Sequence, residues 1–127
     1  MAQTNIETQR GSLPQVIHQI GDLLNKYESN ASQIETEFTT LAETWYRETL
    51  HSSQYLDKIL HPAYQRIIGL GKDVIPFVLR ELQEQPFEWF WALRALTGED
   101  PTTPEQTGKR DEMARAWLNW GKENSYI

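Results

Sequence analysis

The sequence predicts an all-α protein, with an N-terminal helical hairpin packed on a multi-helix C-terminal half. Apolar residues recur at spacings of three and four through most of the chain, which is the pattern of amphipathic helices. Glycine and proline fall mainly near the ends of these runs, where helices stop and start. The chain has 127 residues, 39% of them hydrophobic and none of them cysteine, so it is long enough to bury a core without a disulfide.

The two ends of the chain suggest a simple domain organisation. Residues 1–11 are polar and mixed in charge, so we predict a flexible tail there and a single helical domain over residues 12–127. No segment has the run of about 18 to 20 apolar residues that a membrane span needs. The N-terminus also lacks the apolar stretch of a secretory signal. We therefore expect a cytoplasmic protein with no membrane contact.

The first two predicted helices cover residues 13–28 and 33–50 and form the hairpin. The first carries an apolar stripe, made of Val16, Ile17, Ile20, Leu23, Leu24 and Tyr27. The stripe of the second is Ile34, Phe38, Leu41 and Trp45. Ser12 is the predicted N-cap of the first helix, and Ser32 with Glu35 forms a capping box for the second. Residues 29–31 form a short polar joint of a length suited to an antiparallel turn.

Proline and glycine then divide the middle of the chain. A helix ends at His61, because Pro62 pushes the residue before it out of the helical region. The glycines of residues 69–71 end the next helix, since glycine tolerates the left-handed conformation found there. Asp73 is the predicted N-cap of the helix that follows, which places Pro76 in its first turn.

Two helices are predicted in the C-terminal third. Residues 87–96 are apolar nearly all round, as is typical of a central, buried helix, and Gly98 ends this segment. The last helix has two possible starts. Thr103-Pro104-Glu105-Gln106 would make a good N-terminus, whereas Gly108 would weaken a helix that began there and favours a start nearer Lys109. We expect this helix to close at Gly121.

Two resemblances extend this prediction. Residues 64–101 are similar to a HEAT-type helical hairpin in Gly71, Ile75-Pro76, Leu82 and Ala95-Leu96, which implies a HEAT-like C-terminal half. Residues 38–126 resemble a family of small uncharacterised bacterial helical proteins, from which no activity can be transferred. The segments that carry this second resemblance are Trp45, Glu48-Thr49, Ser52-Ser53, His61-Pro62-Ala63-Tyr64, Glu81-Leu82, Trp89-Phe90-Trp91-Ala92-Leu93, Thr97-Gly98 and Ala116-Trp117-Leu118-Asn119-Trp120-Gly121.

The densest polar cluster flanks the end of the second predicted helix and consists of Glu48, Thr49, His51, Ser52, Ser53 and His61. It holds the residue types of an acyl-transfer site, where a histidine activates a serine and a carboxylate orients the histidine. One hypothesis is therefore a hydrolase that uses Ser52 or Ser53, with His51 or His61 as base and Glu48 as acid.

The alternative for the same cluster is structural. A serine would cap the following helix, His61 would fill the position before a proline, and Glu48 would pair with Arg47 or Lys58. No strained nucleophile turn and no glycine-rich oxyanion loop accompanies the cluster, which favours this alternative.

Four of the tryptophans are candidate interface residues: Trp89, Trp91, Trp117 and Trp120. Trp89 and Trp91 are two residues apart, or about 200° around a helix, so they cannot share one face. If one is buried, the other must meet another layer, a partner or water. Because tryptophan is enriched at interface hot spots, binding to a protein partner or self-association competes with core packing as an explanation.

The charged residues argue against nucleic acid as a partner. The chain has 12 Lys+Arg and 18 Asp+Glu, a net charge of −6, and its cations are scattered. A nucleic-acid-associated regulator would have to use Lys109, Arg110 and Arg115. We predict no metal and no cofactor, because the sequence has no cysteine, no pair of histidines at helical spacing and no glycine-rich phosphate loop.

Together these observations favour a small cytoplasmic helical module for protein–protein interaction, or an adaptor, with no catalytic activity of its own. Its partner is an unknown protein or a second copy of the chain.

Overall fold

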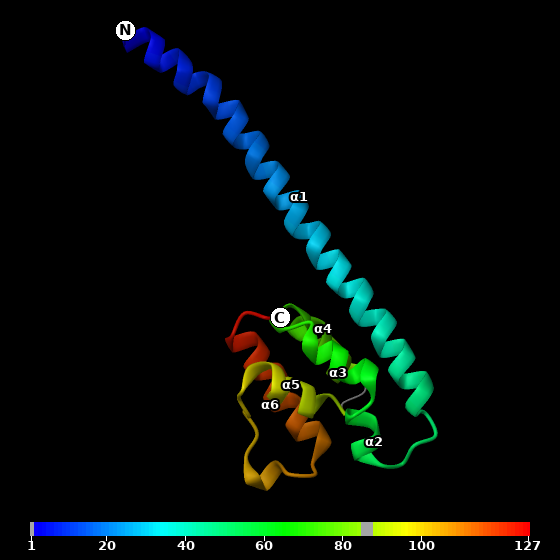
Figure 1. Cartoon of the computed structure of the whole chain (residues 1–127). Helices are drawn as coiled ribbons and strands as arrows, with labels where there is room; N and C mark the ends of the chain where they lie inside the picture. The colour runs from blue at the N-terminus through cyan, green and yellow to red at the C-terminus, as the bar shows by residue number, and fades with distance from the viewer. Residues whose placement is uncertain (1, 85–87) are drawn as a thin grey trace. The chain divides into compact units, whose positions relative to one another are not determined.

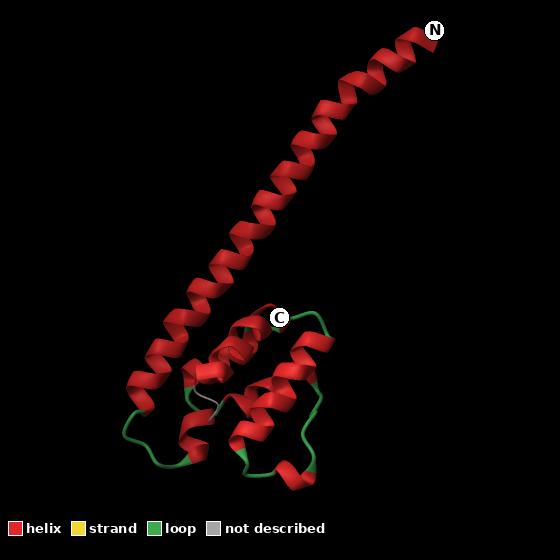
Figure 2. Ribbon diagram, turned by 180° about the vertical axis from the view of Figure 1, so that it is seen from behind, coloured by secondary structure: helices red, strands yellow, loops and turns green. Residues whose placement is uncertain are grey.

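The computed structural model describes the backbone of residues 2–84 and 88–127 and the side chains of residues 13–84 and 88–127. These residues contain helices and loops and no strand, so the all-α prediction is confirmed (Figure 2). The elements are labelled in Figure 1. They are α1 (Ala2–Thr49), α2 (Tyr55–Ile59), α3 (Pro62–Gly69), the 3₁₀ turn η1 (Lys72–Val74), α4 (Ile75–Glu84), α5 (Trp89–Thr97), the 3₁₀ turn η2 (Pro104–Gln106) and α6 (Arg110–Glu123).

The chain divides into two units, which are described separately. Unit 1 is residues 1–33 and unit 2 is residues 34–127. Unit 1 consists of the N-terminal part of α1, and its helix already includes the segment 2–11 that we expected to be a tail. Unit 2 holds the C-terminal part of α1 and the remaining helices.

The predicted N-terminal hairpin is wrong, because α1 is one continuous helix (Figure 1). Residues 29–31 are helical and form no turn. The physical reason lies in their composition: they include neither glycine nor proline, and Ala31 has the best helix propensity of any residue. Ser32 likewise lies inside α1, so it begins no helix, and Pro14 lies in the helix interior. Ser12 is also helical, and its side chain lies outside the described residues.

The second predicted stripe forms one wall of the unit 2 core. Phe38 and Trp45 are buried, and Ile34 and Leu41 pack against the core from partly exposed positions. Trp45 is surrounded by aromatic rings: the centroid of Tyr64 lies 5.1 Å from its own and that of Trp89 lies 4.9 Å away. α1 also contributes Ala42 to the core. The remaining core residues come from α2, α3, η1, α4, α5 and α6, and they are Ile59, Ala63, Tyr64, Ile67, Val74, Ile75, Val78, Leu79, Leu82, Trp89, Phe90, Ala92, Leu93, Ala114, Trp117 and Trp120.

Two tyrosine hydroxyls, from the buried Tyr64 and the half-buried Tyr46, tie α3 and α1 to the start of α5. The Tyr64 hydroxyl donates to the carbonyl oxygen of Glu88 and accepts from the backbone N–H of Ala92 at 2.9 Å. The Tyr46 hydroxyl accepts from Trp89 Nε1 at 3.0 Å. Burial raises the pKa of both hydroxyls well above the usual tyrosine range, so both stay protonated.

The predicted starts and ends of these helices are largely confirmed. α3 starts at Pro62, α5 ends at Gly98 with φ 70°, and α6 begins beside Lys109. Asp73 is not a helix N-cap: it lies within η1, which follows Gly71 in a left-handed conformation with φ 83°.

The predicted helix end at Gly121 is wrong, because α6 continues to Glu123. Gly121 instead permits close packing. A Cβ atom at this position would lie 2.7 Å from the Leu79 Cδ1 atom of α4. The start of the predicted 87–96 helix falls at Phe87, outside the described residues, and α5 begins at Trp89.

Candidate functional site

Of the predicted polar cluster, the structure brings Glu48 and His61 together. His61 Nε2 lies 3.4 Å from Glu48 Oε1. On the other side of the ring, His61 Nδ1 accepts a hydrogen bond from the backbone N–H of Ala63 at 3.0 Å. Because Nδ1 is an acceptor, the ring proton is on Nε2, which donates to the carboxylate. His61 is therefore the N-cap of α3.

This geometry leaves His61 without a nitrogen that could act as a base. A catalytic base needs a free lone pair within about 2.6 to 3.2 Å of the serine hydroxyl. Both ring nitrogens of His61 already have a partner. In a triad the acid binds Nδ1 and the serine faces Nε2, whereas here the Glu48 carboxylate occupies the Nε2 side. Ser52 Oγ accepts only from the backbone N–H of Gln54, at 3.4 Å, among the hydrogen bonds of the described residues.

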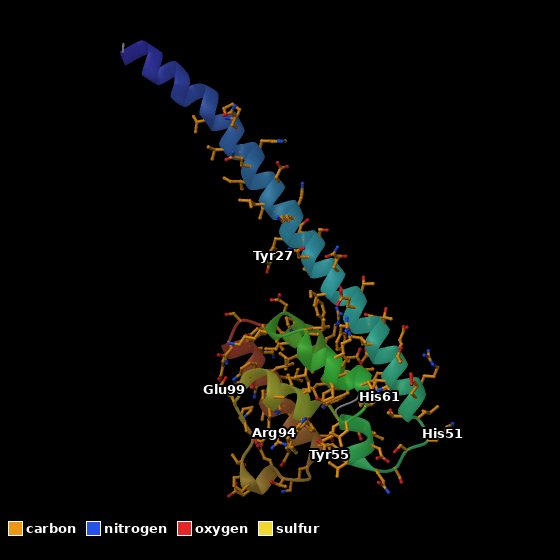
Figure 3. The ribbon with its side chains drawn as sticks, in the orientation of Figure 1. Tyr27, His51, Tyr55, His61, Arg94 and Glu99 are labelled. Atoms are coloured by element: carbon orange, nitrogen blue, oxygen red, sulfur yellow. The ribbon has the colours of Figure 1, made fainter. Side chains whose placement is uncertain are left out.

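The other cluster members lie elsewhere. The Thr49 side chain is buried, and its hydroxyl donates to the Trp45 carbonyl at 2.6 Å, which is a bond within α1. His51 and Ser53 are exposed in the loop after α1, and His51 lies away from His61 in Figure 3. Glu48 pairs with His61 and with neither Arg47 nor Lys58. Lys58 pairs instead with Glu88, at 3.3 Å. The structure gives the hydrolase hypothesis no assembled nucleophile and base.

The predicted tryptophan interface needs correction. Trp89 and Trp117 are each 1% exposed and Trp120 is 8% exposed, so these three side chains are core. Trp91 alone of the four candidates reaches the surface, where it is 40% exposed with the Arg94 guanidinium 5.2 Å above its ring. Trp89 and Trp91 do face opposite sides of α5, as their spacing predicts. One half-exposed tryptophan covered by an arginine is a small surface.

The three candidate nucleic-acid-binding cations do not form a common basic surface. Lys109 precedes α6, and Arg110 and Arg115 are five residues apart, or about 140° around the helix. Arg115 lines a surface hollow together with Glu112 and Glu123.

Arg110 lines a different hollow, of about 350 Å³, together with Glu88 and Asp100. Tyr55 and Arg94 also line it, from α2 and α5, and are labelled in Figure 3. Because carboxylates accompany the cation in each hollow, neither offers the positive field that phosphates require.

The most exposed apolar surface of the described residues lies on α1, within unit 1. We call it the α1 stripe, and its members are Leu13, Val16, Ile17, Ile20, Leu23, Leu24 and Tyr27. Their exposed fractions run from 45% for Val16 to 73% for Tyr27, which stands out from the helix in Figure 3. Polar residues occupy the opposite side of the helix, where His18 and Asp22 pair at 3.5 Å.

The sequence predicts this stripe but not its exposure. Six of its members form the apolar stripe of the first predicted helix, which was expected to pack inside a hairpin. Periodicity shows that a helix has an apolar face, and it does not show what covers that face. The seven-residue spacing of Leu13, Ile20 and Tyr27 is the signal that could have identified a partner-binding helix.

Comparisons with protein-family models, with curated proteins and with solved structures gave no match to this chain. The HEAT-like arrangement and the bacterial family therefore stay predictions. The described residues contain no group of three or more metal-ligating side chains. Every helix in that part of the chain lacks either the length or the apolar character that a membrane crossing requires.

Proposed function

We propose that this chain is a protein–protein interaction module, or an adaptor, that acts by binding and catalyses no reaction, and that its contact surface is the α1 stripe. The observation that carries the proposal is the exposure of seven large apolar side chains on one helix face. The chain has no cysteine and therefore no disulfide, which fits the proposed action in a reducing compartment, the cytoplasm.

The size of the α1 stripe supports this role. A fully exposed aliphatic side chain presents about 100 Å² of apolar surface. This area is the free energy of transferring the side chain out of water divided by about 25 cal/mol per Å². At the exposed fractions of the stripe, seven side chains present roughly 400 Å². This is the size of the largest apolar patch on a typical monomeric protein, about 300 to 600 Å², and such patches often have a binding role.

The helix itself also favours a covered stripe. An isolated helix is marginal in water, and most helical stability in proteins comes from packing of the apolar face. α1 contains Gly11, Pro14 and Gly21 within unit 1, each of which disfavours a helix relative to alanine. A partner that covers the stripe would supply packing free energy, which would offset the low helix propensity of these three residues.

Photo-cross-linking from the two faces of α1 in living cells tests the proposal. A benzophenone amino acid replaces Ile20, on the stripe, or Asn25, on the polar face. We expect a discrete protein adduct from position 20 that is absent from position 25. The proposal also requires that Leu23→Asp remove this adduct while Ser29→Asp, on the polar face, keeps it. Equal adducts from both faces, or none from position 20, would contradict the proposal.

A further inference from the structure

Building on the proposed function, we infer that the partner of the α1 stripe is a second copy of this chain, with the two helices packed antiparallel about an axis between Ile20 and Leu23. In this dimer the α1 stripe of one copy packs against the α1 stripe of the other, and the two helices cross near the middle of the stripe.

The stripe follows a heptad register. With Leu13 at position a, Ile20 and Tyr27 also fall at a, and Val16 and Leu23 fall at d. Ile17 and Leu24 occupy the e positions, which widens the apolar face beyond a strict a/d seam. Heptads of this kind pack helix against helix, with each side chain entering a gap on the partner. In an antiparallel pair, a positions face d positions, so Ile20 would lie against Leu23 of the second copy and Val16 against Tyr27.

The area suits two copies better than one copy against a small ligand. Two stripes together would bury about 800 Å² of apolar surface, taking about 400 Å² from each. Homodimer interfaces are about 65% apolar, so the total interface would reach about 1,200 Å². This value lies at the lower end of the range of stable protein interfaces.

The charges of unit 1 allow identical copies to meet. Its basic residues are Arg10 and Lys26, and its acidic residues are Glu7, Asp22 and Glu28, so the segment is almost neutral. Unit 2 carries most of the net charge of −6. Of the e and g positions beside residues 13–27, only Lys26 is charged, and no like charges would face each other across the two-fold axis.

The e positions indicate the orientation. In an antiparallel pair, e residues of one helix face e residues of the other, so Ile17 would pack against Leu24 of the second copy. In a parallel pair, e faces g, and Leu24 would instead meet the polar Gln19. Only the antiparallel arrangement buries the apolar e residues against each other.

The solution mass gives the first test. Analytical ultracentrifugation of the full chain should show a dimer of the 14.8 kDa protomer at micromolar concentration. Ile20→Asp would bury two carboxylates in the apolar layers beside the axis, each against Leu23 of the other copy, so the dimer dissociation constant should rise at least about 100-fold. The matched control is Asn25→Asp on the polar face, which adds the same charge and should leave the constant within about threefold.

Disulfide cross-linking tests the orientation, and it is clean because the chain has no cysteine of its own. Under mild oxidation, Val16→Cys mixed with Tyr27→Cys should give a cross-linked dimer, because position 16 of one copy faces position 27 of the other. Neither variant alone should do so. Cross-linking of Val16→Cys to itself and of Tyr27→Cys to itself would show a parallel pair and overturn the inference.

The failure of this inference can be separated from failure of the proposed function. A monomer that still gives a stripe-specific adduct with another protein in cells would overturn the second copy and leave the interaction module intact. A monomer with no adduct from position 20 would overturn both.

Discussion

Replacing His61 separates a structural histidine from a catalytic one. His61 caps α3 by accepting the backbone N–H of Ala63, and it donates to Glu48 across 3.4 Å. His61→Ala removes both bonds. Loss of an N-cap typically costs about 1 kcal/mol of unfolding free energy. The carboxylate of Glu48 is half exposed, so the lost pair adds only about 0.5 kcal/mol.

The expected loss is therefore about 1.5 kcal/mol in the free energy of unfolding. For a unit the size of residues 34–127, this lowers Tm by roughly 6 to 12 °C. Tryptophan fluorescence is the suitable readout, because every tryptophan of the chain lies in unit 2 and the signal therefore reports the unfolding of that unit.

His61→Asn supplies the control, since asparagine is a good N-cap and should restore most of the lost stability. A melting temperature unchanged in His61→Ala would refute the capping role. Equal losses in His61→Ala and His61→Asn would also refute it, because the imidazole would then act through something other than the cap.

The remaining predictions concern the core and the serines. Tyr64→Phe should cost about 1 to 3 kcal/mol, because two backbone groups lose their buried partner, whereas Tyr55→Phe, which removes an exposed hydroxyl, should be neutral in the same urea titration. Burial raises the pKa of Tyr46 and Tyr64, so the folded state keeps protons that the unfolded state loses above the ordinary value of 10.0. Stability should therefore fall as pH rises past 10, by up to about 1.4 kcal/mol per unit for each tyrosine, and less steeply in Tyr64→Phe; a flat profile from pH 8 to 11 would contradict this. Gly121→Ala should destabilise the protein by about 1 kcal/mol in thermal melts. The added Cβ would overpack the α4–α6 contact, and the free-energy cost of this should exceed the gain in helix propensity from alanine. A raised Tm would show that the contact relaxes without cost. A serine-reactive phosphonate should leave Ser52 unmodified in the intact mass spectrum, and a label that Ser52→Ala abolishes would revive the hydrolase hypothesis.

Unit 2 was well predicted because its signals are local and strong. The Phe38 to Trp45 stripe, the break at Pro62 and the left-handed Gly98 each follow from the preferences of a few neighbouring residues. The turn at residues 29–31 failed for the same kind of reason. A polar stretch is compatible with a loop and with the solvated face of a helix, and without glycine or proline nothing stops the helix.

The candidate site was harder to predict than the fold. Proximity in sequence grouped Glu48, His61 and the serines, yet their roles depend on which nitrogen of His61 faces which partner, and only coordinates supply that. Tryptophan composition could not separate the buried Trp89 from the exposed Trp91, although the spacing showed that they had to differ. The α1 stripe was found as a pattern and assigned to the interior, because core and interface faces share one periodicity.

If another chain covers the α1 stripe in the cell, the stripe is shielded from water there, and cysteine labelling in living cells measures this shielding directly. The chain has no cysteine, so Leu23→Cys reports the stripe and Asn25→Cys reports the polar face of the same helix. A membrane-permeant maleimide should modify Asn25→Cys quickly and Leu23→Cys several times more slowly, with the two rates converging when the cells are denatured. Equal rates in intact cells would show that the stripe faces water and would contradict the account.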